Sequence, residues 1–236
     1  MSEYRQTKNA LPAAQLQALT AALMGSPFVA SSQLNGAFVT SRGFGVAFTA
    51  EGRARVEAEL PALVPFFTLA IDGLAESRLQ SFWQRARVPK PNAWYLNLLL
   101  VGTAGGVAPH VDATLSRAAG EAETTPRVVS VLYLQVPDCG GGELVLGREK
   151  KLKGVIHPRV GTLLHFRGDL THQVRALADD APKNAARASL VLEQYHFGAE
   201  AVAKLPAYRL DSRAKFKLAL EAAAKRPTPE MDVDRG

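Results

Sequence analysis

The chain has 236 residues and a hydrophobic fraction of 47%, which suits one large domain or a domain with a helical extension, and excludes extensive disorder outside the termini. Its net charge of +6 favours anionic partners, but the basic residues are scattered and lack the interleaved aromatic residues of a nucleic-acid platform. The single cysteine, Cys139, excludes an internal disulfide and favours a reducing cytosol. The polar N-terminal stretch predicts no signal peptide, and no apolar run approaches the roughly 20 residues that span a bilayer. We therefore expect a cytoplasmic protein without a membrane partner.

The first segment, residues 1–92, predicts helices and a β-hairpin that pack on a following core. In residues 11–24 leucines recur at helical spacing, and Gly25 can end the helix. Residues 33–49 are rich in glycine and β-like, with short apolar runs around Arg42 and Gly43, which predicts a hairpin that turns there. Two further helices are predicted over residues 51–60 and 74–87.

The second segment, residues 93–200, predicts a β-rich core. Apolar segments separated by turn residues occur at residues 94–101, 128–136, 143–146, 154–157, 161–166, 173–177 and 188–197. Many short strands at this spacing are typical of a sandwich or a barrel. Residues 201–236 predict a helix over 211–224, with Asp211 as its N-cap, followed by a polar tail. The predicted fold class is α+β with a mainly β core: a double-stranded β-helix (jelly roll) with N-terminal helices packed on it and a C-terminal helix.

Three residues carry the candidate chemistry: His110, Asp112 and, sixty residues after Asp112, His172. Residues i and i+2 of a strand point to the same face, so His110 and Asp112 can bind one ion together, and a distant strand can bring His172 to the third corner. Two imidazoles and one carboxylate on one face of an octahedron suit non-haem Fe(II) oxygenases. A His-x-Asp pattern alone is common by chance, so the sequence around it decides the interpretation.

Several blocks around this pattern resemble the prolyl 4-hydroxylase-like branch of the Fe(II)/2-oxoglutarate-dependent dioxygenases. In chain order they are the strand and glycine loop at 95–106, His110 with Asp112, Tyr133 in a Leu-Tyr-Leu run, the glycine-rich hairpin at 140–144, the Pro-x-x-Gly-x-Leu turn at 158–163, His172, and the Arg-x-Ser pattern of Arg187 and Ser189. The match covers somewhat under half of the chain. The shared order of the blocks is more specific than any single block.

The resemblance implies an enzyme in which His110, Asp112 and His172 are the metal ligands and the catalytic centre. Fe(II) would be the metal, with 2-oxoglutarate and O₂ at its remaining positions. Arg187 would bind the far carboxylate of 2-oxoglutarate, because a guanidinium group pairs with a carboxylate bidentately. Ser189 shares the face of Arg187, and Tyr133 would donate its phenol hydrogen to that carboxylate, with a plain core aromatic as the competing interpretation. The implied products are a hydroxylated C–H, succinate and CO₂, and ascorbate is left open as a reductant.

Two segments depart from the family pattern. The interval from His172 to Arg187 is fifteen residues, longer than usual, and the excess maps onto a polar loop at 178–184. Residues 114–125 form a long polar stretch after the metal motif, which the resemblance suggests is a flexible lid. We expect its deletion to spare iron binding and to lower turnover.

Separately, His165 is predicted to be a core or supporting histidine, with a place in the pocket left open.

The expected substrate is a small molecule, such as an amino acid or a biosynthetic intermediate, or a peptide. A protein or peptidyl prolyl hydroxylase is the alternative, because the resemblance is to that branch. A nucleic-acid demethylase is disfavoured, since that group has a second arginine six residues after the first, where this chain has Glu193. Asp112 argues against a halogenase, which has a small residue in place of the carboxylate. A non-catalytic, cupin-like sensor stays open, and the sequence does not specify the oligomeric state.

Overall fold

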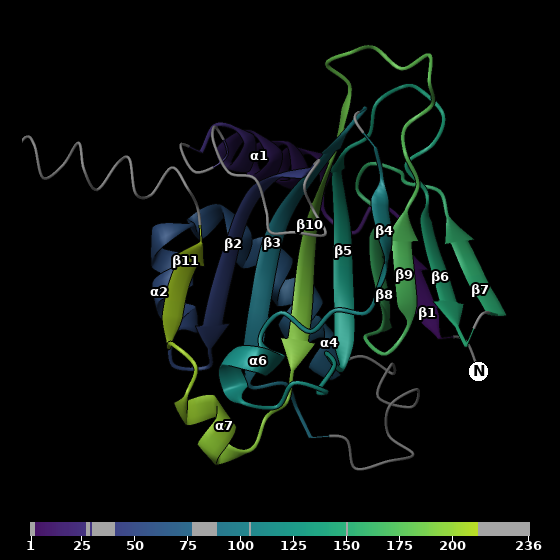
Figure 1. The fold of residues 1–236 in the computed structure, drawn as a ribbon. Coiled ribbons are helices and arrows are strands. Elements are labelled where there is room, and N and C mark those ends of the chain that lie inside the picture. The colour runs from purple at the N-terminus through teal and green to yellow at the C-terminus, as the bar shows by residue number, and fades with distance from the viewer. Residues whose placement is uncertain are drawn as a thin grey trace, which may run out of the picture.

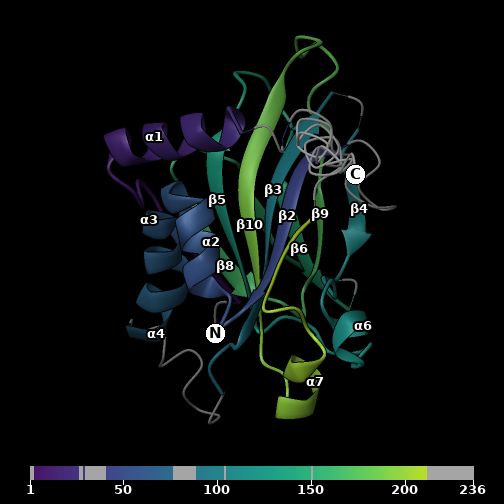
Figure 2. The same ribbon diagram turned by 90° about the vertical axis from the view of Figure 1, so that its left-hand side faces the viewer.

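The computed structural model describes residues 3–26, 29, 41–76, 89–103, 105–149 and 151–211. These residues form three layers: a group of helices, a seven-stranded sheet and a four-stranded sheet (Figures 1 and 2). The larger sheet contains β1 (Tyr4–Thr7), β2 (Ser41–Thr49), β3 (Ala93–Gly102), β5 (Val128–Gln135), β8 (Leu163–Arg167), β10 (Ala186–Tyr195) and β11 (Tyr208–Asp211). The smaller sheet contains β4 (Val107–His110), β6 (Leu144–Arg148), β7 (Lys151–Ile156) and β9 (Thr171–Val174).

Both sheets are antiparallel throughout. The strand order is β1-β8-β5-β10-β3-β2-β11 in the larger sheet and β4-β9-β6-β7 in the smaller one. From β3 to β10 the chain passes back and forth between the two sheets, with the consecutive strands β6 and β7 paired within the smaller one. This is the arrangement of a double-stranded β-helix, so the predicted jelly-roll core is confirmed. Strands β1, β2 and β11 extend the larger sheet at its two edges.

The helices cover one face of the larger sheet, called here the helix face. They are α1 (Ala13–Met24), α2 (Arg53–Glu59), a 3-10 turn (Pro61–Leu63), α3 (Val64–Phe67), a π-helical turn (Thr68–Asp72) and α4 (Gly73–Glu76). Leu19, Phe66 and Phe67 pack with Leu96 and Leu190 from the central strands in one buried cluster. Figure 2 shows these helices on the side opposite the smaller sheet.

The other face of the larger sheet, called here the inner face, looks toward the smaller sheet. Leu99, Val131 and Tyr133 of the larger sheet form a second buried cluster with Leu146 and Val174 of the smaller one. The central strands are thus covered on both faces, which explains why they appear in the sequence as nearly continuous apolar runs. Side chains alternate along a strand, so polar residues between these positions can be assigned to a face.

The predicted helix at residues 11–24 is confirmed as α1, which ends at Gly25, and the one at 51–60 is confirmed as α2. The predicted turn at Arg42 and Gly43 is wrong. Both residues lie inside β2, which is paired along its length with β3. Gly43 has a φ of 151°, and a Cβ there would come within 1.5 Å of the Leu98 carbonyl oxygen. Glycine is therefore needed for a close approach of two strands, which sequence patterns do not separate from a turn.

The C-terminal segment differs from the prediction near Asp211. Asp211 is the last residue of β11, opposite Gly45 of β2, so it extends the sheet at the position expected to be a helix N-cap. The rest of the predicted helix at 211–224, the tail, residues 33–40 and most of the helix at 74–87 lie outside the described residues. The short helical elements that were not predicted are the 3-10 turn, α3 and the π-helical turn between α2 and α4, and further α6 (Ser116–Ala119) and α7 (Ala199–Ala203). None of the helices in the described ranges combines the length and the apolar character that a bilayer crossing requires.

Candidate active site

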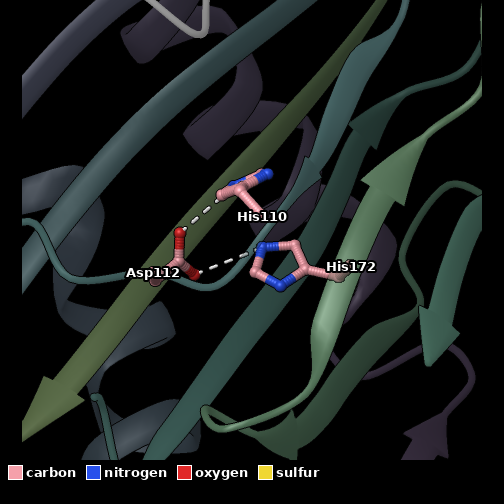
Figure 3. A group of neighbouring side chains, drawn as sticks. All are labelled: His110, Asp112 and His172. Atoms are coloured by element: carbon pink, nitrogen blue, oxygen red, sulfur yellow. Dashed lines mark ion pairs between the residues drawn. The ribbon is translucent and has the colours of Figure 1, made fainter. Parts of the chain in front are cut away.

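The three candidate metal ligands meet at the end of β4. His110 is the last residue of β4 and lies directly opposite His172 of β9 in the antiparallel register, with 4.3 Å between the ring centroids. Asp112 follows two residues later, beyond the strand, in an extended segment that turns back toward both rings. Figure 3 shows the carboxylate of Asp112 facing the two imidazoles. Asp112 was expected on the strand; it lies just after the strand, and its carboxylate still faces His110.

The three side chains present their ligand atoms to a common point. His110 Nε2 lies 3.4 Å from Asp112 Oδ1, and His172 Nε2 lies 3.4 Å from Asp112 Oδ2. All three ligand atoms are within 4.8 Å of one another. Neighbouring ligands about 2.1 Å from an octahedral ion lie about 3 Å apart, so these separations fit a bound divalent ion after a small contraction.

Backbone contacts set the orientation of both imidazoles. His110 Nδ1 lies 2.8 Å from the carbonyl oxygen of Ala108, and His172 Nδ1 lies 3.1 Å from that of Leu170. A carbonyl oxygen only accepts, so each Nδ1 carries the hydrogen, and each Nε2 keeps its lone pair for a metal. Each histidine therefore uses a carbonyl two residues before it to fix its tautomer.

Electrostatics keep the metal-facing carboxyl ionised. Burial by itself raises the pKa of Asp112, but the two imidazoles, His172 foremost, hold that pKa well below its usual range. For His110, burial lowers the pKa, while the Asp112 carboxylate and the Ala108 carbonyl outweigh it and raise the pKa above its ordinary value.

The residues expected to bind 2-oxoglutarate lie on the inner face of the larger sheet. Ala188 and Leu190 belong to the buried cluster between the larger sheet and the helices, called here the helix-face cluster. Because side chains alternate along a strand, Arg187 and Ser189 point to the inner face, and Ser189 lies opposite Tyr133 of β5. The register shifts between Ala188 and Ser189, which is a β-bulge in β5 of the kind found next to functional sites. The structure therefore brings the three predicted residues to one patch of the inner face.

This patch is buried and short of partners. Arg187 Nε, Tyr133 Oη and Ser189 Oγ are buried and have no hydrogen-bond partner among the described residues. Arg187 donates from Nη1 to the carbonyl oxygen of Gly142 at 2.6 Å, and its guanidinium carbon lies 5.5 Å from the centre of the Tyr133 ring. Burial lowers the pKa of Arg187, and burial raises the pKa of Tyr133. Unsatisfied buried polar groups are costly, and three together fit a ligand that accepts hydrogen bonds and carries negative charge.

The glycine-rich hairpin expected at residues 140–144 supports Arg187. Gly142 has a φ of 73°, and a Cβ there would lie 3.6 Å from Arg187 Cδ and 3.2 Å from Leu177 Cδ2. The left-handed backbone turns the Gly142 carbonyl to the guanidinium group. The long interval between His172 and Arg187 is taken up by the loop between β9 and β10, as expected, and Arg187 keeps its place in β10 opposite Val101.

Residues 114–125 are more ordered than the word lid suggests. They contain α6, whose buried Ala119, with Leu115 just before the helix, packs with α7 residues such as Ala201. Ser116 Oγ donates to the carbonyl oxygen of Thr124 and closes the stretch into a loop. Its role in turnover stays a prediction.

Sequence reasoning missed a second polar group on the inner face of β10. Glu193 is buried, Thr114 Oγ1 donates to its Oε1 at 2.7 Å, and the Tyr195 hydroxyl donates to its Oε2. Burial, reinforced by the nearby Asp112 charge, raises the pKa of Glu193 to about 8. In the sequence, Glu193 was noted only because it occupies the position at which nucleic-acid demethylases have a second arginine. The alternation Arg187, Ser189, Val191, Glu193 was the signal that placed it on the same face.

A third inner-face polar residue, Asn97, was also missed. It lies between Leu96 and Leu98, which belong to the helix-face cluster, so its side chain points to the inner face. Its Oδ1 is buried and has no hydrogen-bond partner among the described residues. In a strand that is otherwise apolar, such an amide was the available signal.

His165 lies away from the site. Its neighbour Leu163 belongs to the helix-face cluster, and its ring contacts Ser130 Oγ through Nδ1 at 2.8 Å. Gln194 extends this buried chain, because its Nε2 donates to Ser130 Oγ and to the carbonyl oxygen of Ala70. His165 is therefore a core histidine under the helices, and the option that it lines the pocket is wrong.

Comparisons with known proteins agree on the fold. No family model and no curated protein sequence matches the chain. Among solved structures, a prolyl-4-hydroxylase from Pseudomonas putida superposes with a TM-score of 0.57 at 20% identity, covering 84% of this chain and 95% of that one. A prolyl hydroxylase from Trichoplax adhaerens, in complex with a hypoxia inducible factor peptide fragment, gives a TM-score of 0.54 at 18% identity, with 83% and 84% covered.

A third structure, from Burkholderia pseudomallei, is described as an oxidoreductase of the 2OG-Fe(II) oxygenase family. It gives a TM-score of 0.50 at 16% identity and covers 84% of this chain and 87% of that chain. The strand order, the jelly-roll core and these superpositions lead to one conclusion. This chain has the fold of the 2-oxoglutarate- and Fe(II)-dependent oxygenases, prolyl hydroxylases among them.

Proposed function

We propose that this protein is an Fe(II)- and 2-oxoglutarate-dependent dioxygenase that hydroxylates an unactivated C–H of a small molecule or a peptide, releasing succinate and CO₂. One observation carries the proposal. Two imidazoles and a carboxylate converge at one place on the inner side of the jelly roll, and a buried arginine on the same side has no acidic partner among the described residues. The shared fold supports this assignment.

In this proposal, His110, Asp112 and His172 hold Fe(II), with both histidines binding through Nε2. Bound iron supplies the activation of O₂, with 2-oxoglutarate as the source of two electrons. Arg187 binds the far carboxylate of 2-oxoglutarate with its free N–H groups, and the hydroxyls of Tyr133 and Ser189 donate to the same group. Val131 and Leu99 of the inner-face cluster exclude water from this pocket. A dry pocket strengthens the charge pairing and limits side reactions.

A peptidyl prolyl hydroxylase is the second candidate. Two of the structures with the same fold are prolyl hydroxylases, and one of them is bound to a peptide. Proline-containing peptides therefore belong in the substrate panel beside free amino acids.

Anaerobic titration of the protein with Fe(II) and 2-oxoglutarate tests the proposal. We expect a metal-to-ligand absorption band in the visible range when both are present, and succinate release above background with a substrate from the panel. Asp112→Ala should abolish the band. Arg187→Ala should keep metal binding and raise the 2-oxoglutarate concentration for half-saturation by about tenfold or more, since a charge-assisted pair is lost.

The exposed residues Asp179 and Arg175 provide matched controls. Asp179→Ala and Arg175→Ala should leave the band unchanged. Absence of the band in the wild-type protein, together with no succinate from any substrate, would falsify the enzyme assignment. Equal loss of metal affinity in the Asp112 and Arg187 variants would mean that the role of Arg187 is misassigned.

A further inference from the structure

Strand β10 carries two buried ionisable residues on its inner face, and neither has a partner of opposite charge among the described residues. Arg187 is 2% exposed and Glu193 is 4% exposed. No carboxylate lies within ion-pair distance of Arg187, and no lysine, arginine or histidine of the described chain lies within that distance of Glu193. Ionising a buried group that has no partner of opposite charge costs several kcal/mol, which is why the pKa of Glu193 is raised. A ligand of opposite charge would offset this cost at each residue, and at Glu193 it would stabilise the ionised carboxylate.

Arg187 and Glu193 are too far apart to form an ion pair with each other. They are six positions apart on one strand, which places their Cα atoms about 20 Å from each other at roughly 3.3 Å per residue. The hydroxyls of Thr114 and Tyr195 give Glu193 hydrogen bonds but no positive charge. A carboxylate has about four lone-pair directions, so two remain for a further donor.

Asn97 is an independent observation beside Glu193. It is 8% exposed and lies opposite Val191 in the β3–β10 register, two residues from Glu193 on the same face. Diagonal neighbours of this kind lie about 7–8 Å apart, so one small group between them can contact both side chains. Asn97 Oδ1 has no donor among the described residues and is buried. Both side chains thus offer acceptors to the same space, whereas the patch around Arg187 offers donors.

We propose that Glu193 and Asn97 form the subsite for a protonated amino group of the primary substrate. This inference rests on the proposed function, because it assigns the Arg187 end of the inner face to 2-oxoglutarate and the Glu193 end to the substrate. The Glu193 end adjoins Asp112, since Thr114, which donates to Glu193, follows Asp112 by two residues. The subsite is deeply buried, which favours a free amino compound that enters whole over the amino group of a peptide.

The test uses the full-length protein with Fe(II) and 2-oxoglutarate. Free amino acids, their N-acetylated counterparts, and short peptides with free or acetylated amino groups are compared by succinate release and by the change that each causes in the absorption band. We expect turnover with at least one free amino acid and none with its N-acetylated form. Turnover of peptides with a free amino group, and of no single amino acid, would keep the subsite and assign it to a peptide amine.

Two variants test the residues directly. Glu193→Gln keeps the shape and removes the charge, so we expect the KM of the amine substrate to rise about tenfold or more, with the absorption band retained. Asn97→Leu removes the unpaired oxygen and should give a similar rise in KM with a Tm at or above that of the wild type, because an unsatisfied buried group is lost.

Matched changes serve as controls. Glu200→Gln, on the exposed first turn of α7, should change nothing. Asn92→Leu should lower the Tm, because the Asn92 side chain bonds both the N–H and the carbonyl of Phe197. The inference is overturned if N-acetylated substrates are used as well as free amines, if both site variants keep the wild-type KM, or if no amine is turned over. Loss of the absorption band in the wild type would instead overturn the proposed function.

Discussion

At the scale of single residues, the site is defined by polar atoms that lack partners. The candidate metal ligands were identifiable from the sequence, because His110 and Asp112 are two residues apart and His172 is part of a block pattern. Arg187, Tyr133 and Ser189 were also identifiable from such blocks, and the structure groups them. Glu193 and Asn97 were not identifiable from the sequence. Whether a buried polar atom has a hydrogen-bond partner depends on the side chains of the neighbouring strands, and no local pattern contains that information.

Tyr133 provides a prediction at this scale. Tyr133→Phe removes a buried hydroxyl that has no partner among the described residues, so the free energy of unfolding should not fall, while the dissociation constant of 2-oxoglutarate should rise about fivefold. Urea unfolding and titration of the absorption band measure the two effects. Tyr195→Phe is the control: its hydroxyl donates to Glu193, so this variant should lose about 1 kcal/mol of stability. An unchanged 2-oxoglutarate affinity in Tyr133→Phe would leave Tyr133 as a core aromatic.

His165 predicts a pH dependence of stability. Burial, with a smaller effect of the Arg5 charge, lowers the pKa of His165 from 6.5 to about 4. Between these values the unfolded chain binds a proton that the folded chain does not, so stability falls as the pH drops from about 6.5 to about 4. The loss is about 3 kcal/mol at 1.36 kcal/mol per pKa unit. Above about pH 6.5 His165 is neutral in both the folded and the unfolded chain, so it causes no such loss of stability there.

Urea unfolding at several pH values measures this dependence. The difference between the wild type and His165→Gln isolates the residue, since the other histidines are common to both proteins. The slope below pH 6.5 should be smaller in the variant. An identical slope in the two proteins would show that His165 is not the group responsible.

At the scale of elements, the strands were predictable and their partners were not. The apolar segments between turn residues placed the core strands to within a few residues of their observed bounds, and Gly25 marked the end of α1. The turn expected at Gly43 failed because the positive φ of a glycine serves a close strand contact as well as a turn. Asp211 failed as a helix cap because pairing with β2 outweighs a local capping preference.

Gly43 gives a prediction about β2. Gly43→Ala would place a Cβ within 1.5 Å of the Leu98 carbonyl oxygen in backbone that disfavours side chains, so β2 must separate from β3. We expect a loss of about 3 kcal/mol or more in the free energy of unfolding. Gly198→Ala is the control, since a Cβ there meets nothing within 4 Å. Equal stability of the two variants would argue against the central position of β2.

The loop at residues 114–125 carries a prediction about turnover. Replacing residues 117–123 with a short glycine linker keeps Thr114, which donates to Glu193, but removes most of α6. We expect the absorption band with Fe(II) and 2-oxoglutarate to persist and succinate release with substrate to fall. Unchanged turnover would remove the lid hypothesis.

At the scale of the whole molecule, strands from three parts of the chain share one sheet. In the larger sheet, β1 and β2 come from the N-terminal segment, β3, β5, β8 and β10 from the middle, and β11 from the C-terminal segment. Because β1 pairs with β8, β2 pairs with β3 and β11 pairs with β2, the added strands continue the sheet of the core. We therefore expect one cooperative unfolding transition, with far-UV circular dichroism and tryptophan fluorescence coinciding. Two separated transitions would indicate that the edges unfold independently.

The sequence by itself determined the fold class of this protein and its candidate metal ligands. Short apolar segments between turn residues predict the strands, and the order of the blocks around His110, Asp112 and His172 resembles a known family. Only the tertiary structure decided which polar side chains are left without partners on the inner face. Whether a polar side chain has a partner depends on all the strands that surround it, and those strands are far apart in the chain. The donor patch around Arg187 and the acceptor pair of Glu193 and Asn97 therefore emerge only when β3, β5 and β10 lie side by side.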